Sequence, residues 1–332
     1  MIIWDAVIFA YEQGLLVNMA SKPPDAEYVL REETAVHSVL FLGDKLLAGA
    51  EDGKISEWNL TTFRKEQTVL NAGTSACMAL KLLSNTLVTQ ERKGHINLWT
   101  LQESSWSVSK FVQLDYYGFS RIDTADDQGG IVACPKKHSN VEIYCLKSRS
   151  KIVSFGRDRD GNIALGEVMA LKVIHISQEP YLLVAYESGD LHLWDFRKQY
   201  AVSHLKCDNC LTAIDFSEIT MTGICAGVSN HVVFFKIDNS RSLVRILGKD
   251  ILNAGVSSVK IRPDNKLVAL GCWDGRLRLF SWKSYRPLAG LTEHSTEVSD
   301  ITFSTGHAAS FMAAGGKDRK ISLWNIYNTT SS

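Results

Sequence analysis

The sequence lacks an excess of either charge, since 36 Lys and Arg residues balance 36 Asp and Glu residues in 332. There is therefore no basic field of the kind that binds nucleic acid, and no run of like charge that would form a tail. The first 20 residues are mostly apolar, but Asp5 and Glu12 place two charges within them. The apolar run is therefore too interrupted for a membrane span. We expect protein partners, with no nucleic acid and no membrane.

The chain also lacks the residue patterns of metal sites and catalysts. Its seven cysteines have no framework spacing, and Cys207 and Cys210 form one isolated CxxC without a second pair nearby. No Gly-x-Ser-x-Gly elbow is present, and the nine histidines are scattered. Residues 156–162 resemble a calcium loop but lack the alternating acids and the terminal glutamate. We expect no metal, no cofactor, no catalytic residue and no small-molecule substrate.

What is present is a repeat. A small turn followed by a strand that ends in an aromatic residue recurs at steps of 41, 45, 50, 41, 45 and 44 residues. The aromatic anchors are Trp58, Trp99, Tyr144, Trp194, Phe235, Phe280 and Trp324. A period of about 40–45 residues with four strands each is typical of a WD40 propeller blade. The repeat predicts an all-β fold, a seven-bladed WD40 β-propeller, in place of the two domains that length alone suggests.

The turn before each anchor has its own chemistry. Five residues before the aromatic residue lies a glycine in four repeats, as in GAEDGKISEWNL and GCWDGRLRLFSW. Glycine permits the positive φ of a tight hairpin turn. Ser139 and Asn230 take this position in the degenerate third and fifth repeats, and asparagine is the next best residue for a left-handed turn. These turns predict hairpins at equivalent points of every blade.

The two ends of the chain predict how the ring closes. After Trp324 only eight residues remain, too few for a complete fourth strand, whereas residues 26–31 form a strand without an earlier blade to join. We expect residues 26–31 to supply the outer strand of blade seven, which removes an open sheet edge. The predicted boundaries are an N-terminal extension over 1–24, poorly ordered, the propeller over 25–327, and a tail over 328–332.

The last two repeats carry a more specific resemblance. IRPDNKLVALGCWDGRLRLFSWKSYRPLAGLTEHS and AAGGKDRKISLWNIY are similar to the guanine nucleotide-binding protein beta-subunit-like family, whose fungal counterparts are ASTRA-associated proteins. The resemblance implies a non-catalytic adaptor that works with co-chaperone subunits in the maturation of phosphatidylinositol-3-kinase-related kinases. It thereby implies a role in DNA-damage and growth signalling, in the cytoplasm and nucleus.

The sequence also bears on three other functions: a beta-type subunit, another signalling scaffold and an enzyme. A heterotrimeric beta-type subunit would need a long N-terminal coiled-coil helix, but Pro23 and Pro24 interrupt this segment and no heptad is sustained. Another signalling scaffold is also compatible with the repeats. An enzyme would need a nucleophile with a base, and His294 is better explained as a structural partner of the turn residue Asp318. Asp52 and Asp274 hold the equivalent turn positions in blades one and six.

Partner binding is expected where the turns converge on one face of the ring. Trp273 is the strongest candidate, because Phe280 already serves as the core anchor and exposed tryptophans dominate interface energetics. Packing on a neighbouring turn is the alternative for Trp273. Arg157 and Arg159 lie in the longest interval and could form a polar contact loop. The related turn positions are occupied by Glu51, Arg92, Glu187 and Lys317.

Overall fold

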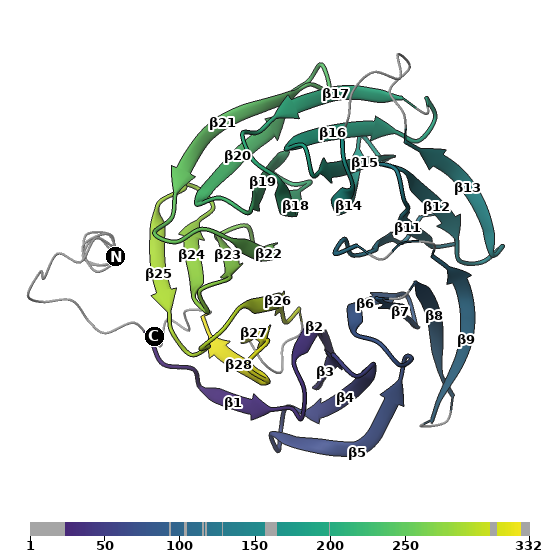
Figure 1. Ribbon diagram of the computed structural model, residues 1–332, viewed down its shortest axis with the longest axis vertical. Helices are drawn as coiled ribbons and strands as arrows, with labels where there is room; N and C mark the ends of the chain where they lie inside the picture. The colour runs from purple at the N-terminus through teal and green to yellow at the C-terminus, as the bar shows by residue number, and fades with distance from the viewer. Residues whose placement is uncertain are drawn as a thin grey trace, which may run out of the picture.

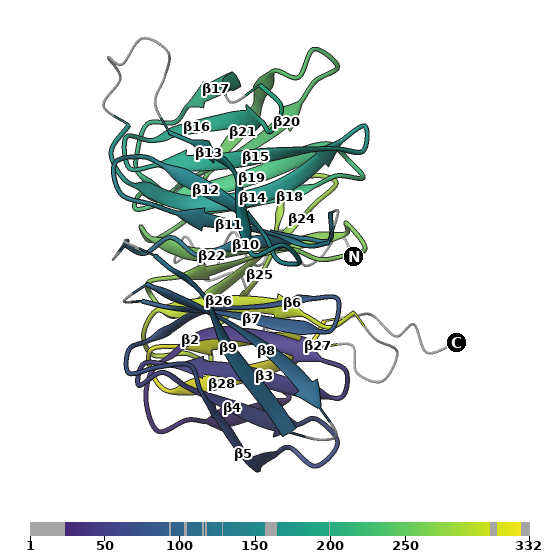
Figure 2. The same cartoon turned by 90° about the vertical axis from the view of Figure 1, so that its right-hand side faces the viewer.

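The protein is a ring of seven four-stranded antiparallel sheets around a central axis (Figure 1). The computed structural model describes residues 24–92, 94–102, 105–114, 116, 118–127, 129–156, 165–198, 200–305 and 311–326. Among these residues no helix is both long and apolar enough to cross a membrane. The predicted seven-bladed propeller is confirmed, and Figure 2 shows the same ring turned on edge.

Each of the first six blades is built from consecutive strands. Blade one contains β2 (Val36–Leu42), β3 (Lys45–Ala50), β4 (Lys54–Asn59) and β5 (Arg64–Asn71). Blade two contains β6 (Cys77–Leu83), β7 (Thr86–Glu91), β8 (His95–Gln102) and β9 (Ser105–Gln113). Blade three contains β10 (Asp123–Ala125), β11 (Ile131–Pro135), β12 (Val141–Cys145) and β13 (Ser150–Phe155).

The next three blades repeat this order. Blade four contains β14 (Val168–Ile176), β15 (Glu179–Tyr186), β16 (Asp190–Asp195) and β17 (Ala201–Lys206). Blade five contains β18 (Leu211–Ser217), β19 (Thr222–Gly227), β20 (His231–Ile237) and β21 (Leu243–Asp250). Blade six contains β22 (Val256–Ile261), β23 (Leu267–Cys272), β24 (Leu277–Ser281) and β25 (Pro287–Leu291).

Blade seven combines both ends of the chain. It contains β26 (Val298–Phe303), β27 (Phe311–Gly316), β28 (Lys320–Asn325) and, as its outer strand, β1 (Tyr28–Arg31). β1 runs antiparallel to β28, with Tyr28 opposite Leu323. The predicted closure strand is therefore confirmed. Its regular pairing with β28 begins at Tyr28, and before that residue the Glu27 amide donates to the Leu323 carbonyl at 2.8 Å. The boundaries predicted for the extension and the tail stay predictions.

The core lies between neighbouring blades rather than at one centre. The anchors Trp58, Trp99, Trp194, Phe235, Phe280 and Trp324 are all buried. In blade three, Tyr144 is only half-buried, because its hydroxyl donates to Glu142 Oε2 at 2.6 Å and must stay near polar groups. Each aromatic anchor packs a blade against its neighbour, as stacked repeats require.

The turns before the anchors follow the glycine prediction with one exception. Gly53, Gly94, Gly189 and Gly275 have φ values of 81°, 99°, 86° and 79°. Ser139 takes the same left-handed conformation at 62°. Asn230 is not among the described residues with positive φ, so the prediction of a left-handed turn at Asn230 is wrong. Blade five instead holds this turn through Ser229, whose Oγ accepts a hydrogen bond from the His231 amide at 3.2 Å.

Candidate functional site: the mouth of the central channel

The first strand of every blade faces the axis, and a cavity of about 550 Å³ lies there. Its volume is within the range of small-ligand and peptide pockets. The residues at one end of the cavity come from the turns and loops where the sequence predicted partner binding. They include His37, Arg92, Phe119, Val228, Trp273, Glu297 and Lys317. These residues form the channel mouth.

Trp273 lies at the channel mouth, where it packs on a neighbouring turn and stays partly exposed. Its amide donates to the Gly255 carbonyl at 3.0 Å, and the ring covers Gly255 so closely that a Cβ there would lie 2.2 Å from Cδ2. The side chain nevertheless stays 43% exposed. Gly255 therefore holds the indole in place on one side, while the other side is free to contact a partner.

Lys317 and Arg92 lie at the channel mouth and differ in how closely each is paired with a carboxylate. Lys317 forms an ion pair with Glu297, which also accepts a hydrogen bond from Ser257 Oγ at 2.7 Å. Arg92 has a weaker ion pair, with Nη1 3.5 Å from Glu51 Oε1. Its Nε is buried without a hydrogen-bond partner among the described residues. Arg92 is thus held less tightly by its counter-ion than Lys317 is.

The remaining predicted contact residues are less closely associated with the channel. Glu51 does not line the cavity but contacts its rim through Arg92 and through His37 Nε2. Glu187 does not line the cavity either, and its Oε2 accepts the Glu167 amide at 3.2 Å at the entry to its own blade. Arg157 and Arg159 lie outside the described residues, so their assignment stays a prediction.

Sequence reasoning missed the apolar side chains at the mouth. Phe119 is 68% exposed and Val228 is 38% exposed, and both line the cavity with Trp273. Phe119 belongs to the connection between β9 and β10, which contains no repeat motif. An aromatic residue followed by Ser-Arg in such a connection was a usable signal, because exposed aromatic residues and arginines are enriched in interfaces.

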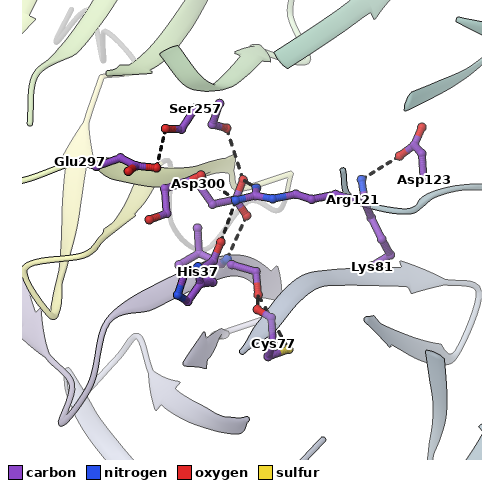
Figure 3. Close-up of polar contacts among 12 residues, drawn as sticks. His37, Cys77, Lys81, Arg121, Asp123, Ser257, Glu297 and Asp300 are labelled. Carbon is purple, nitrogen blue, oxygen red and sulfur yellow. Dashed lines mark hydrogen bonds and ion pairs between the residues drawn. The ribbon is translucent and has the colours of Figure 1, made fainter. Parts of the chain in front are cut away.

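Arg121, from the same connection, reaches across to the opposite side of the channel (Figure 3). Its Nη1 lies 2.6 Å from Asp300 Oδ1 in blade seven. Its Nη2 donates to the carbonyls of His37 and Ser299 at 2.8 and 2.7 Å. One side chain thus ties blades one, three and seven together below the mouth.

The histidine–aspartate pair of blade seven lies outside this cavity and is structural. His294 Nδ1 lies 2.9 Å from Asp318 Oδ1, and His294 Nε2 lies 2.8 Å from Ser322 Oγ. The same hydroxyl oxygen lies 2.8 Å from Trp324 Nε1, which donates to it. Burial, the largest single influence, raises the pKa of Asp318, but the contacts with His294 and with the Ser295 and Lys320 amides together lower the pKa overall. The chain of contacts connects the turn to the buried anchor.

The equivalent turn aspartates have different partners. Asp52 accepts the Lys54 amide at 3.2 Å and pairs with Lys54 Nζ at 2.9 Å, without a histidine. Asp274 binds the guanidinium of Arg278 through both oxygens, at 3.0 and 2.8 Å. Burial opposes ionisation of Asp274, yet Arg278 and Asn253 lower its pKa to about 2.

A further network in blade one was not predicted. Glu32 directly follows β1 and contacts Ser56, which lies two residues before the anchor Trp58, as Ser322 lies two residues before Trp324. Its carboxylate accepts hydrogen bonds from Ser56 Oγ at 3.0 Å and Trp58 Nε1 at 2.6 Å, and Lys65 Nζ lies 2.7 Å away. Glu32 therefore reaches the anchor without a histidine between them.

Replacing Asp318 by alanine is expected to destabilise the protein by about 1–3 kcal/mol, the cost of leaving a buried donor unpaired. The variant removes the acceptor for His294 and for the Ser295 amide, which lies 3.0 Å from Oδ2. Urea unfolding measures the difference. Asp208→Ala, at an exposed position, is the matched control. Equal midpoints for the two variants would contradict a stabilising network.

The cysteines and histidines form no metal site in the described part of the chain, where no three His, Cys, Asp or Glu residues gather suitably. Cys207 Sγ lies 3.8 Å from Cys225 Sγ, and all seven cysteines are free thiols. The side chains at the channel mouth are aromatic, apolar or charged. Such an arrangement can bind a protein segment or a small polar ligand.

Comparison with known proteins agrees with the propeller geometry. The WD40 family, described as WD domain, G-beta repeat, matches residues 242–281 and 285–325. Guanine nucleotide-binding protein subunit beta-like protein 1 of Mus musculus is 31% identical over 319 residues, covering 92% of this chain and 97% of the relative. ASTRA-associated protein 1 of Schizosaccharomyces pombe is 24% identical over 372 residues, covering 92% and 99%. The near-complete coverage at 31% identity shows that the chain belongs to the WD40-repeat family of guanine nucleotide-binding protein subunit beta-like protein 1.

Proposed function

We propose that this WD40 scaffold is a non-catalytic adaptor that acts with a co-chaperone complex in the maturation of phosphatidylinositol-3-kinase-related kinases. The observation that carries the proposal is the similarity, over 92% of the chain, to a fungal protein named for its association with ASTRA. The role supports DNA-damage and growth signalling, and we place it in the cytoplasm and nucleus. Co-chaperone subunits and the kinases themselves are the proposed partners.

The channel mouth is the proposed partner-binding surface. Trp273 presents an indole that Gly255 has already positioned, so a partner need not order it on binding. Phe119 adds exposed apolar surface, and Arg92 adds a guanidinium whose ion pair with Glu51 is long. This combination of aromatic and arginine side chains is typical of interface hot spots.

Replacing Trp273 by alanine is expected to weaken co-purification of the partners while the ring stays folded. Truncation of a hot spot costs about 2 kcal/mol or more, which corresponds to roughly a thirtyfold loss of affinity. Quantitative mass spectrometry of affinity-purified complexes measures the loss. Kinase protein levels should fall without a matching fall in their messenger RNA, because the proposed role is maturation.

Ile219→Ala is the matched control, since Ile219 is 80% exposed in the turn between β18 and β19, at the opposite end of the strands. Circular dichroism must show the same spectrum for both variants. A folded Trp273→Ala variant that retains every partner would refute the mouth as the binding surface. Recovery of G-protein gamma and alpha subunits in place of co-chaperones would favour the alternative of a beta-type subunit.

A further inference from the structure

Below the channel mouth, one residue from each blade lies at the same level of the ring. In every blade this residue belongs to the first strand and lies opposite a residue of the second strand. That second-strand residue lies in turn opposite the third-strand residue that directly precedes the aromatic anchor. Lys260, for example, lies opposite Ala269, which lies opposite Leu279, the residue before Phe280. From blade one to blade seven, this channel belt consists of Leu40, Lys81, Asp123, Lys172, Asp215, Lys260 and Thr302.

The channel belt therefore alternates in charge over five consecutive blades. Lys81 Nζ lies 2.7 Å from Asp123 Oδ1, and Lys172 Nζ lies 3.2 Å from Asp215 Oδ1. Lys172 also lies 4.0 Å from Asp123. Burial alone would raise the pKa values of both carboxyls, but the lysines lower them, and both carboxylates stay ionised. Two lysines are thus matched by two aspartates.

Within the described part of the chain, Lys260 is the lysine of the channel belt that has no aspartate as a direct partner. Among the described residues its ammonium forms no hydrogen bond and no direct ion pair, and Asp300, the next carboxylate above, is bound to Arg121. Burial is the main cause that lowers the pKa of Lys260 to about 8, and repulsion from Lys81 and Lys172 adds to it. Attraction from Asp215 and Asp300 opposes this lowering. Lys260 is half-buried in the wall of the channel, where an ammonium without a direct counter-ion is unfavourable and an anionic ligand would be stabilised.

On one side of Lys260, the next two residues of the channel belt are uncharged. Following the ring from blade six through blade seven and blade one to blade two, Lys260 is followed by Thr302, Leu40 and then Lys81. A hydroxyl and an apolar side chain thus separate two ammonium groups, and no carboxylate of the belt lies between them. All four residues line the cavity of about 550 Å³, which is large enough for a small molecule.

We propose that the central channel contains an oxyanion-binding site in which Lys260 and Lys81 bind one carboxylate or phosphate-type group beside the Thr302 hydroxyl. Ammonium groups form charge-assisted hydrogen bonds to such oxyanions, and threonine can donate another. The group enters either on a free small molecule or on the acidic side chain of a bound segment. The proposal is independent of the adaptor role, because it concerns the purified chain alone.

The test uses the purified full chain with inorganic sulfate as the probe, since its charge is constant between about pH 7 and about pH 9. A blocked glutamate-containing tripeptide is the second probe. At constant ionic strength, the melting temperature should rise with probe concentration and reach saturation, because a ligand that binds the folded state stabilises it. A response to sulfate identifies the site of a free anion, and a response to the peptide alone identifies a side-chain site.

Lys260→Met is expected to lose about tenfold or more in probe affinity, the loss of one charge-assisted hydrogen bond. Without the probe it should melt at the same temperature as the unchanged protein or higher at about pH 7, because its neutral side chain avoids burying a charge. Lys110→Met, at an exposed position of β9, is the matched control and should bind like the unchanged protein.

The pH dependence supplies a second readout. Since the pKa of Lys260 is about 8, its charge is present below that pH and lost above it, so affinity should fall between about pH 7 and about pH 9. Lys260→Arg stays charged over this range and should abolish the fall. The proposal is overturned if neither probe stabilises the protein, or if Lys260→Met responds like Lys110→Met.

Discussion

Replacing Asp300 by alanine is expected to lower the free energy of unfolding by about 3–5 kcal/mol, the cost of removing one partner of a buried ion pair. The carboxylate holds Arg121 Nη1 at 2.6 Å and accepts the Val39 amide at 3.1 Å and the Ser258 hydroxyl at 3.3 Å. Its loss therefore affects contacts among blades one, three, six and seven. Urea unfolding followed by tryptophan fluorescence measures the effect.

A second substitution distinguishes an unpaired charge from a general packing defect. In the Asp300→Ala background, Arg121→Ala should recover part of the lost stability, because it removes the guanidinium that has lost its partner. Asp44→Ala, in the exposed turn between β2 and β3, should leave the midpoint nearly unchanged. If the losses from Asp300→Ala and Arg121→Ala simply add, the two side chains do not stabilise the ring as a pair.

Removing residues 1–31 is expected to lower stability by about 3 kcal/mol or more and to expose the edge of β28. β1 contributes the buried side chain of Leu30 and the ring of Tyr28, which stacks on Phe63 with centroids 3.5 Å apart. Each such apolar side chain contributes about 1.5–3 kcal/mol when it is buried. The melting temperature and the fraction of aggregated protein measure the result.

Removing residues 1–18 is the matched control. This deletion keeps Glu27 and all of β1, so every described contact with β28 is retained. We expect a melting temperature close to that of the full chain. Equal melting temperatures for the two truncated proteins would mean that β1 contributes nothing to closure.

The architecture was predictable because its signals are local and repeated. Trp194 and Trp324 each follow a short turn and an alternating strand, and the same pattern seven times leaves few other folds possible. The closure strand followed from a shortage of residues after Trp324. Asn230 shows the limit of such reasoning, because the side chain of Ser229 supplies another way to hold the turn.

The site was only partly predictable, since its residues come together only in the closed ring. Trp273 could be recognised from its own turn, where it has no role as an anchor. Lys260 and Lys81 belong to separate repeats 179 residues apart, and each resembles an ordinary polar residue of a strand. Arg121 likewise reaches Asp300 across the axis, a contact that no periodicity within the chain encodes.

Closure by β1 also has a consequence for how the protein is made. Tyr28 is synthesised early, but its partner Leu323 follows 295 residues later. Blade seven thus stays incomplete until β28 has been synthesised, and such long-range pairing forms slowly because a very large loop must close first. Until then the edge of β28 can pair with other chains. Newly synthesised chains of this protein should therefore depend on folding assistance most strongly until β1 has paired with β28.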